Sequence, residues 1–334
     1  MKTPNPRTIS IASAALLALA LPMAACAGDQ PQAWTDPDTA LNEDQDFAIQ
    51  GEYAAEGHGV QVAALGDGAF RAYAYDGGLP GAGWSPGMTR TLLEGGREDD
   101  DVVVLASEEG ATTATIRNGT LKLNGSDGGE KELNRVTRES PTLGAEPPEG
   151  AVILFDGTSA DAWEGGRMED GLLLATSSLT KEHFTDYRLH VEFRTPYVPH
   201  ARGQRRGNSG VYFGGRWETQ ILDSFGFGEG AGDNGGVYAI AAPQLNMSLP
   251  PLTWQTYDVE FTAARFDDEG NRTEWPRMTV KLNGVLVHEN LELSRDYTPA
   301  APIDGPLVSA EGPVYLQHHN NPVVFRNVWL VPLD

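Results

Sequence analysis

The stretch G-N-S-G-V-Y-F-G-G-R-W-E-T-Q-I-L-D-S-F-G, residues 207–226, decides the fold of the second half of the chain. Two runs in which polar and apolar residues alternate flank a Gly-Gly-Arg turn, a pattern typical of neighbouring β-strands. Successive side chains of a strand point to opposite faces, so Glu218 and Gln220 share one face. Asn208 and Tyr212 likewise share one face of the preceding run. The stretch therefore predicts adjacent strands with a face that collects Asn, Tyr, Glu and Gln.

Such a polar face has two interpretations. It could form the floor of a site for a polyhydroxylated ligand, or it could be the solvated outer face of an antiparallel sheet. The solvated face is the more common fate of this pattern, and alternation alone favours it.

Composition limits the class of protein and the class of partner. The chain has 334 residues, which is enough for two domains of ~100–200 residues each. Hydrophobic residues make up 40%, and 39 glycines and 22 prolines supply turns, which indicates a globular, turn-rich, all-β protein. The formal net charge of −23 argues against nucleic acid as a partner, because phosphate binding needs clustered Lys and Arg.

The N-terminus has the pattern of a targeting segment. Lys2 and Arg7 precede an apolar run over residues 9–21 that is too short to span a membrane. The small residues that follow end at Cys26 and resemble a bacterial lipoprotein cleavage box, which predicts a signal peptide over residues 1–26 and a membrane anchor through lipid on Cys26. We therefore expect an exported protein in the bacterial envelope, with the outer membrane favoured by the alanine after the cysteine. The alternative is an ordinary signal peptide that is cut elsewhere.

Four further segments follow the signal peptide. Residues 27–46 are rich in Asp, Pro, Gln and Thr, and are predicted to be a flexible tether. Residues 47–138 contain short alternating runs between turn signals, which predicts a small antiparallel β-domain without an assigned role. Residues 139–150 form a Pro-rich linker. Residues 151–334 show strand after strand without a long amphipathic helix, which predicts a sandwich or a barrel.

The only cysteine of the chain is the one in the cleavage box. The mature fold is therefore expected to have no disulfide, although its compartment is oxidising. A cysteine nucleophile and a thiolate metal site are not expected either.

Six segments of the second half match, in order, the motifs of a known family. They are V-I-L-F-D-G-T-S-A-D-A-W (152–163), Y-R-L-H-V-E-F-R (187–194), the stretch at 207–226, W-Q-T-Y-D-V (254–259), L-N-G-V-L-V (282–287) and G-P-V-Y-L-Q-H-H-N-N-P-V-V-F-R-N-V (312–328). Together they resemble the 3-keto-disaccharide hydrolase domain family, long known as a domain of unknown function, over about residues 150–334. The resemblance implies a concanavalin-like jelly-roll sandwich whose curved sheet binds sugars on its concave face.

Strand parity and the resemblance together select candidate site residues. In two further predicted strands the alternation places Glu192 with Arg194, and Gln317 with His319. The sequence departs from the family pattern at His318 and at the Asn two residues later. If the polar faces lie on the concave sheet, eight side chains converge, namely Glu192, Arg194, Asn208, Tyr212, Glu218, Gln220, Gln317 and His319.

The resemblance implies cleavage of a glycoside that is already oxidised to a ketone at C3. The carbonyl acidifies the proton on C2, and removal of that proton gives an enolate that expels the C1 oxygen before water adds back. Glu218 or His319 would be the base, and Arg194 or a divalent metal would stabilise the oxyanion. A separate sugar 3-oxidoreductase would make the ketone. The residues that bind the oxidised oligosaccharide or glycoside would be Glu192, Asn208, Tyr212, Gln220 and Gln317.

Competing interpretations stay open at this point. A direct glycosidase needs two carboxyl groups ~5–10 Å apart, and the candidates are Glu218 with Glu192 or with Asp223. A non-catalytic, lectin-like carbohydrate-binding module would use the same polar face without turnover. A structural or adhesion lipoprotein would not need that face. Arg194 could also hold the fold through an ion pair with a glutamate, and His319 could be a structural hydrogen-bonding residue.

Overall fold

A computed structural model describes residues 32–125 and 129–333 of the chain. The predicted signal peptide at residues 1–26, with the predicted lipidation site at Cys26, lies outside the described residues. Within the two described ranges, no helix is both long enough and apolar enough to cross a membrane.

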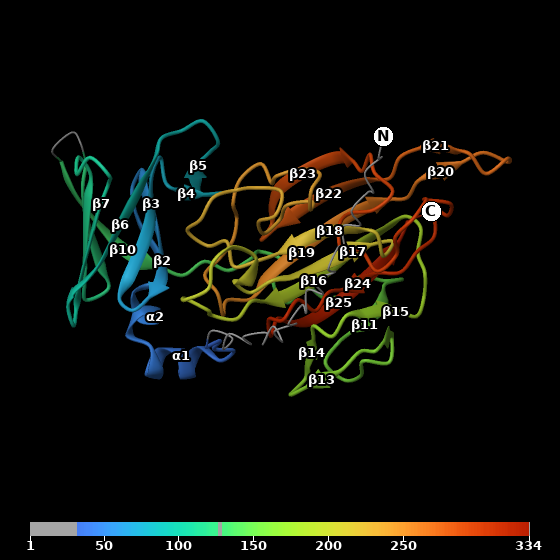
Figure 1. Cartoon of the computed structure of the whole chain (residues 1–334), viewed down its shortest axis with the longest axis horizontal. Helices are drawn as coiled ribbons and strands as arrows, with labels where there is room; N and C mark the ends of the chain where they lie inside the picture. The colour runs from blue at the N-terminus through green and yellow to red at the C-terminus, as the bar shows by residue number, and fades with distance from the viewer. Residues whose placement is uncertain (1–31, 126–128, 334) are drawn as a thin grey trace, which may run out of the picture. The chain divides into compact units, whose positions relative to one another are not determined.

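The first half of the described chain folds into a closed β-barrel (Figure 1). Two short strands, β4 (Leu79–Pro80) and β5 (Gly83–Trp84), pair with each other beside it. Alternating apolar side chains such as Val60 and Leu121 fill the interior, so the β-domain predicted at 47–138 is a packed barrel. The barrel closes in the order β1-β10-β9-β8-β7-β6-β3-β2, with strands β1 (Gly51–Ala55), β2 (His58–Gly66), β3 (Ala69–Asp76), β6 (Arg90–Asp99), β7 (Val102–Ala106), β8 (Thr113–Arg117), β9 (Thr120–Asn124) and β10 (Glu130–Val136).

The prediction of a flexible tether at residues 27–46 is wrong from Trp34 onward. Helix α1 (Pro37–Glu43) is capped by the carboxylate of Asp36 and begins with proline, and helix α2 (Gln45–Ile49) follows directly. Trp34 packs on Tyr197 with ring centroids 5.3 Å apart, in the same hydrophobic cluster as the barrel interior. Composition did not indicate these helices because Asp, Pro and Thr form loops as well as helix N-termini.

The second half is a sandwich of two antiparallel sheets, which confirms the predicted all-β, jelly-roll-like fold (Figure 1). The larger sheet has the order β13-β14-β25-β16-β19-β22-β23, with β11 paired to β25; its strands are β11 (Val152–Phe155), β13 (Met168–Glu169), β14 (Leu172–Leu174), β16 (Tyr187–Arg194), β19 (Gln255–Thr262), β22 (Arg277–Leu282), β23 (Val285–Glu292) and β25 (Val324–Pro332). The smaller sheet has the order β12-β15-β24-β17-β18, with strands β12 (Trp163–Glu164), β15 (Ser178–Thr180), β24 (Tyr315–Leu316), β17 (Ser209–Phe213) and β18 (Trp217–Ile221). A separate pair is formed by β20 (Arg265–Phe266) and β21 (Arg272–Glu274).

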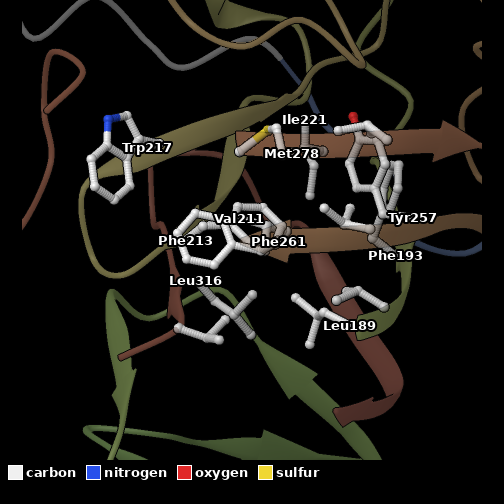
Figure 2. Packing of buried hydrophobic residues seen from close by; sticks show 14 of the residues in the cluster. Leu189, Phe193, Val211, Phe213, Trp217, Ile221, Tyr257, Phe261, Met278 and Leu316 are labelled. Atoms are coloured by element: carbon white, nitrogen blue, oxygen red, sulfur yellow. The ribbon is translucent and has the colours of Figure 1, made fainter. Parts of the chain in front are cut away.

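The apolar half of each alternation forms the core between the sheets (Figure 2). Leu189 and Phe193 come from β16 of the larger sheet, and Phe213 comes from β17 of the smaller one. Across the sandwich, the rings of Phe213 and Phe261 lie 5.7 Å apart between centroids. Burying one such side chain contributes ~1.5–3 kcal/mol. If one strand slipped by one residue, all its apolar side chains would turn from the core to the outer face. Burial of the apolar side chains therefore also determines which side chains of each strand lie on the outer face.

Each sheet therefore has one face in the core and one face directed away from it. On β16, Glu192 alternates with the core residue Phe193, so it lies on the outer face of the larger sheet. On β18, Glu218 alternates with the core residue Trp217, so it lies on the outer face of the smaller sheet. The core separates the two outer faces.

Candidate active site

The outer face of the smaller sheet brings together five of the eight predicted site residues, namely Asn208, Tyr212, Glu218, Gln220 and Gln317. Tyr212 of β17 pairs with Glu218 of β18 on one side and with Tyr315 of β24 on the other. Gln317 follows two residues after Tyr315 and donates from Nε2 to the Tyr212 hydroxyl at 2.7 Å. Gln220 follows two residues after Glu218 and is on the same face. None of these side chains is more than 8% exposed, so this is not the solvated face that alternation alone favours.

Glu218 lies across the neighbouring strand because Gly210 has no side chain. A Cβ built on Gly210 would lie 2.4 Å from Glu218 Oε1 and 2.9 Å from Glu218 Cγ, closer than real Cβ contacts. The glycine of the Asn-Ser-Gly motif therefore provides the space that the carboxyl group occupies.

Burial controls the charge of Glu218. Loss of water around the carboxylate raises the pKa of Glu218 to about 8, although the hydrogen bond from the Tyr212 hydroxyl acts in the opposite direction. Burial, together with the charge of Glu218, raises the pKa of Tyr212, so the phenol stays protonated and donates. A carboxyl group that titrates near neutral pH can accept a proton from a substrate as a general base.

Three amide side chains on this face have side-chain oxygens without a hydrogen-bond partner. Asn208, Gln220 and Gln317 are 2%, 1% and 5% exposed. Across the described ranges, Asn208 Oδ1, Gln220 Oε1 and Gln317 Oε1 are buried and accept no hydrogen bond. Unsatisfied acceptors of this kind are uncommon because each costs ~1–3 kcal/mol. The arrangement offers three acceptors to a ligand that carries hydroxyl groups.

Two further residues belong to this face although the sequence did not select them. Tyr315 has the strand parity of Gln317, a signal that was available, and its ring contacts that of Tyr212 edge-on at 5.2 Å between centroids. In the described part of the chain the Tyr315 hydroxyl forms no hydrogen bond with protein groups. Gln204 lies in the short 3-10 turn Gly203–Arg205, and a turn residue has no periodic signal.

His319 lies just beyond β24 and is exposed. Its backbone carbonyl accepts from Asn321 Nδ2 at 2.9 Å. Its imidazole forms no hydrogen bond or ion pair with the described residues, and nothing links it to Glu218. A role for His319 as base or proton donor stays a prediction.

Glu192 and Arg194 were predicted to converge with Glu218, and the structure corrects this. Both lie on the outer face of the larger sheet, on the far side of the core. The Arg194 guanidinium lies 5.0 Å from the centroid of the Trp254 ring and donates from Nη2 to the Thr35 carbonyl at 3.0 Å. Strand parity gave the correct side of the strand but could not give the sheet to which the strand belongs.

The carboxyl pairs proposed for a direct glycosidase are not formed either. Glu192 is separated from Glu218 by the core. The side chain of Asp223 is fully buried and forms an ion pair with Arg206, with 2.8 Å between Asp223 Oδ2 and Arg206 Nε. Asp223 Oδ1 also accepts from Phe225 N at 3.3 Å, as expected for a residue that caps the following turn. Glu218 is therefore the carboxyl group available for chemistry on its face of the described structure.

Glu192 instead anchors the linker at residues 139–150 to the larger sheet. Glu192 Oε1 accepts from Gly144 N at 2.5 Å and from Asn327 Nδ2 at 2.9 Å, and Oε2 accepts from Arg326 Nε at 2.7 Å. His190 Nδ1 lies 2.7 Å from Asp258 Oδ1 on the same face. Burial favours the neutral forms of both Glu192 and His190. The hydrogen bonds prevail, so the pKa of Glu192 falls to about 2 and the pKa of His190 rises.

We expect Glu192→Gln to lower the free energy of unfolding by ~2–3 kcal/mol at pH 5–6. The folded pKa of Glu192 lies below its ordinary value of 4.5, so this contribution is present above pH 4.5 and is lost as the pH falls toward 2. The raised pKa of His190 adds stability below its ordinary value of 6.5 that is lost as the pH rises through the folded pKa. Urea denaturation across pH 3–8 measures both effects. Exposed Glu260→Gln, on the same face, is the control and should change stability by less than ~0.5 kcal/mol; a Glu192→Gln effect that is equally small would contradict the assignment.

The described residues contain no group of three or more His, Cys, Asp or Glu side chains arranged to hold a metal ion. The divalent metal that the resemblance left open therefore has no ligand set among these residue types in the described ranges.

Comparison with known proteins identifies the family of this chain. The model of the 3-keto-alpha-glucoside-1,2-lyase-like domain matches residues 150–331. The chain belongs to this family. The matched residues span the sandwich up to Val331, within its last strand, and include Glu218, Gly210 and the three amide side chains. The 3-keto-alpha-glucoside-1,2-lyase-like domain therefore contains the candidate active site and leaves out the barrel.

Solved structures extend the comparison. A crystal structure described as a "putative glycosyl hydrolase" from Parabacteroides distasonis ATCC 8503 is 31% identical, covers 56% of this chain and 85% of its own, and has a TM-score of 0.51. A second structure with the same description and source is 21% identical, covers 56% of this chain and 95% of its own, and has a TM-score of 0.41. No curated protein matches the chain. The family and the first structure indicate a carbohydrate-related hydrolase role.

Proposed function

We propose that this protein cleaves 3-keto-glycosides, with Glu218 as the base that removes the C2 proton. The proposal depends above all on the buried carboxyl of Glu218, whose pKa is about 8, beside three amide oxygens without partners. A base of raised pKa suits a weakly acidic C–H bond, because proton transfer is favoured as the pKa values approach each other. The name of the family supports the same substrate class.

The proposed reaction has two stages, an elimination followed by a hydration. Glu218 takes the C2 proton, and the C–H electron pair forms an enolate with the C3 oxygen. When the C3 carbonyl re-forms, a double bond forms between C1 and C2, the C1–O bond breaks and the leaving oxygen takes a proton. Water then adds across C1 and C2, with oxygen to C1 and hydrogen to C2, which gives the free 3-keto-sugar.

The enolate oxygen needs a hydrogen-bond donor. Arg194 was the candidate from sequence, but it lies on the other outer face. The Tyr315 hydroxyl is on the correct face and is not engaged by protein groups of the described ranges, so we assign it to the C3 oxygen. Tyr212 is less suitable because its hydroxyl donates to Glu218 and accepts from Gln317.

The first test uses a 3-keto-disaccharide and its unoxidised parent. If the proposal is correct, the purified protein releases 3-keto-sugar from the oxidised substrate alone, through a transient unsaturated intermediate that absorbs in the ultraviolet. A non-catalytic, lectin-like module is the second candidate, because the same amide oxygens could bind a sugar without turnover. Binding of both sugars without any product would support that module and exclude the enzyme.

The pH dependence of the reaction follows from the pKa of Glu218. Only the ionised carboxyl can accept the C2 proton, so kcat/KM should fall tenfold per pH unit below about pH 8 and level off above it. Steady-state rates with the 3-keto-disaccharide between pH 5.5 and 9.5 measure this profile. A rate that is constant from pH 5.5 upward would rule out Glu218 as the base.

We also propose that the mature protein is lipid-anchored through Cys26 in the bacterial envelope and works after a sugar 3-oxidoreductase. The support is the targeting pattern of residues 1–26 and the need for an oxidised substrate. Radiolabelled palmitate should label the wild type but not Cys26→Ser, and the wild type should enter the outer-membrane fraction. Equal distribution of both forms in the soluble fraction would refute the anchor.

A further inference from the structure

Gln204 joins two of the three amide side chains of the site. Gln204 Oε1 accepts from Asn208 Nδ2 at 2.8 Å and from Gln220 Nε2 at 3.0 Å. Gln204 Nε2 donates to the Gly232 carbonyl at 2.8 Å. Gln204 is itself exposed, so a rim residue holds two buried ones.

The hydrogen bonds determine the orientation of these amides. A backbone carbonyl only accepts, so the end of Gln204 that faces Gly232 must be the NH2 group, and the opposite end must be the oxygen. That oxygen only accepts, so Asn208 and Gln220 must each direct their NH2 groups toward it. Their own oxygens therefore point elsewhere, and these are the oxygens without a partner.

Hydrogen bonds also determine the orientation of the Gln317 amide. The Tyr212 hydroxyl donates to Glu218, so it can accept only from the NH2 group of Gln317. Gln317 Oε1 is left free. The site therefore presents three amide oxygens without a partner, and a ligand that pairs with them must supply the donors.

We propose that Gln204 is a positioning residue, which holds Asn208 and Gln220 so that the site selects a sugar ring with free hydroxyl groups. The inference rests on the proposed function of the same site. A glucoside oxidised at C3 keeps three hydroxyls on that ring, at C2, C4 and C6, which equals the number of free amide oxygens. A deoxy or O-methyl sugar would leave a buried acceptor unpaired and bind less well.

Gln220 is the amide that depends most on Gln204. Asn208 Nδ2 also donates to the backbone carbonyl of residue 204 at 3.0 Å, a bond that any substitution of the side chain keeps. Gln204 Oε1 is the sole hydrogen-bond acceptor that the described structure gives Gln220 Nε2. Without it, the Gln220 amide can rotate and present NH2 in place of oxygen, which weakens binding of a hydroxyl without removing the base.

The test compares Gln204→Met, which keeps the length of the side chain but removes the acceptor, with Gln204→Glu, which keeps it. For 3-keto methyl α-glucoside we expect Gln204→Met to raise KM ~10-fold with kcat within ~3-fold of the wild type. Gln204→Glu keeps the acceptor for Asn208 and Gln220 but loses the donor to the Gly232 carbonyl, so it should recover only part of the increase in KM. Arg205→Ala, an exposed neighbour in the same turn, is the control for loop disruption and should match the wild type. Circular dichroism confirms that every variant is folded.

A second measurement separates this inference from the proposed chemistry. Calorimetry with methyl α-glucoside and its 2-, 4- and 6-deoxy analogues should show ~10-fold weaker binding for each analogue whose missing hydroxyl faces an amide oxygen, and Gln204→Met should reduce that discrimination. If the wild type turns over the keto sugar but Gln204→Met has unchanged KM, the inference is wrong and the chemistry stands. If the wild type binds selectively without turnover, the inference stands and the chemistry is wrong. Absence of both binding and turnover would overturn both.

Discussion

Glu218→Gln should lower kcat for a 3-keto-disaccharide by ~10³-fold, a typical loss for a positioned general base. The amide has the shape of the carboxyl and fits over Gly210, so substrate binding should change much less than the chemical step. Steady-state kinetics at pH 8.5, where the wild-type carboxyl is mostly ionised, measures the loss. Exposed Glu289→Gln on β23 is the matched control and should retain wild-type activity. Retention of more than a tenth of wild-type kcat in Glu218→Gln would exclude the assigned role.

The same substitution should raise the free energy of unfolding at pH 8 by ~3–5 kcal/mol, because it removes a buried charge. The folded pKa of Glu218 is about 8 against an ordinary 4.5, so the contribution of this group to stability is fully present below pH 4.5 and is lost as the pH rises toward 8. The difference between wild type and variant should therefore be small at pH 4.5 and largest at pH 8. Paired urea denaturation curves at these two pH values measure it. If the difference in free energy of unfolding between wild type and variant is the same at pH 4.5 and at pH 8, the pKa of Glu218 is not raised by burial.

Arg206→Met should lower the free energy of unfolding by ~3–5 kcal/mol, the range for breaking a buried ion pair from one side. Asp223 is 3% exposed, and its pKa is already raised by burial, which Arg206 partly offsets. Arg206 also donates from Nη1 to the Ala64 carbonyl at 3.2 Å and to the Pro199 carbonyl at 3.3 Å. Its loss leaves a carboxylate and two carbonyl oxygens without their partner.

A double-mutant cycle separates the ion pair from the bonds to the backbone. Asp223→Asn in the Arg206→Met background should recover part of the loss, because the uncompensated charge is then removed. Denaturant titration of the four proteins measures the coupling. A single-variant loss under 1 kcal/mol, or no coupling between the two sites, would show that the pair is dispensable.

Strand parity was a sound guide to the faces of single strands. It grouped Glu218 with Gln220 and Asn208 with Tyr212, and the structure places all four on one face. Parity is a local property, since it follows from the pleat alone. The assignment of a strand to one sheet or the other depends on pairing between segments far apart in sequence, which parity does not contain. For that reason Glu192 was predicted at the site and lies beyond the core.

The positions of side chains in irregular segments could not be predicted from the sequence either. Gln204 and Arg206 both belong to a Gly- and Arg-rich turn in which strand parity selects no residue. The structure buries Arg206 completely against Asp223 and places Gln204 beside two amides of the site. The cost of burying a guanidinium makes such a position improbable until its partner is known, and the partner is 17 residues away in sequence. Composition could not supply that partner.

The contact between Gly210 and Glu218 gives a criterion for sorting relatives by sequence alone. A homologue with any side chain at the position of Gly210 has no room for a glutamate lying across the strand, so its acid, if present, must adopt another rotamer. Glycine at the first position and glutamate at the second should therefore be gained or lost together. Paired substitution at these two positions would divide the family into members that share this chemistry and members that use the same scaffold for another purpose.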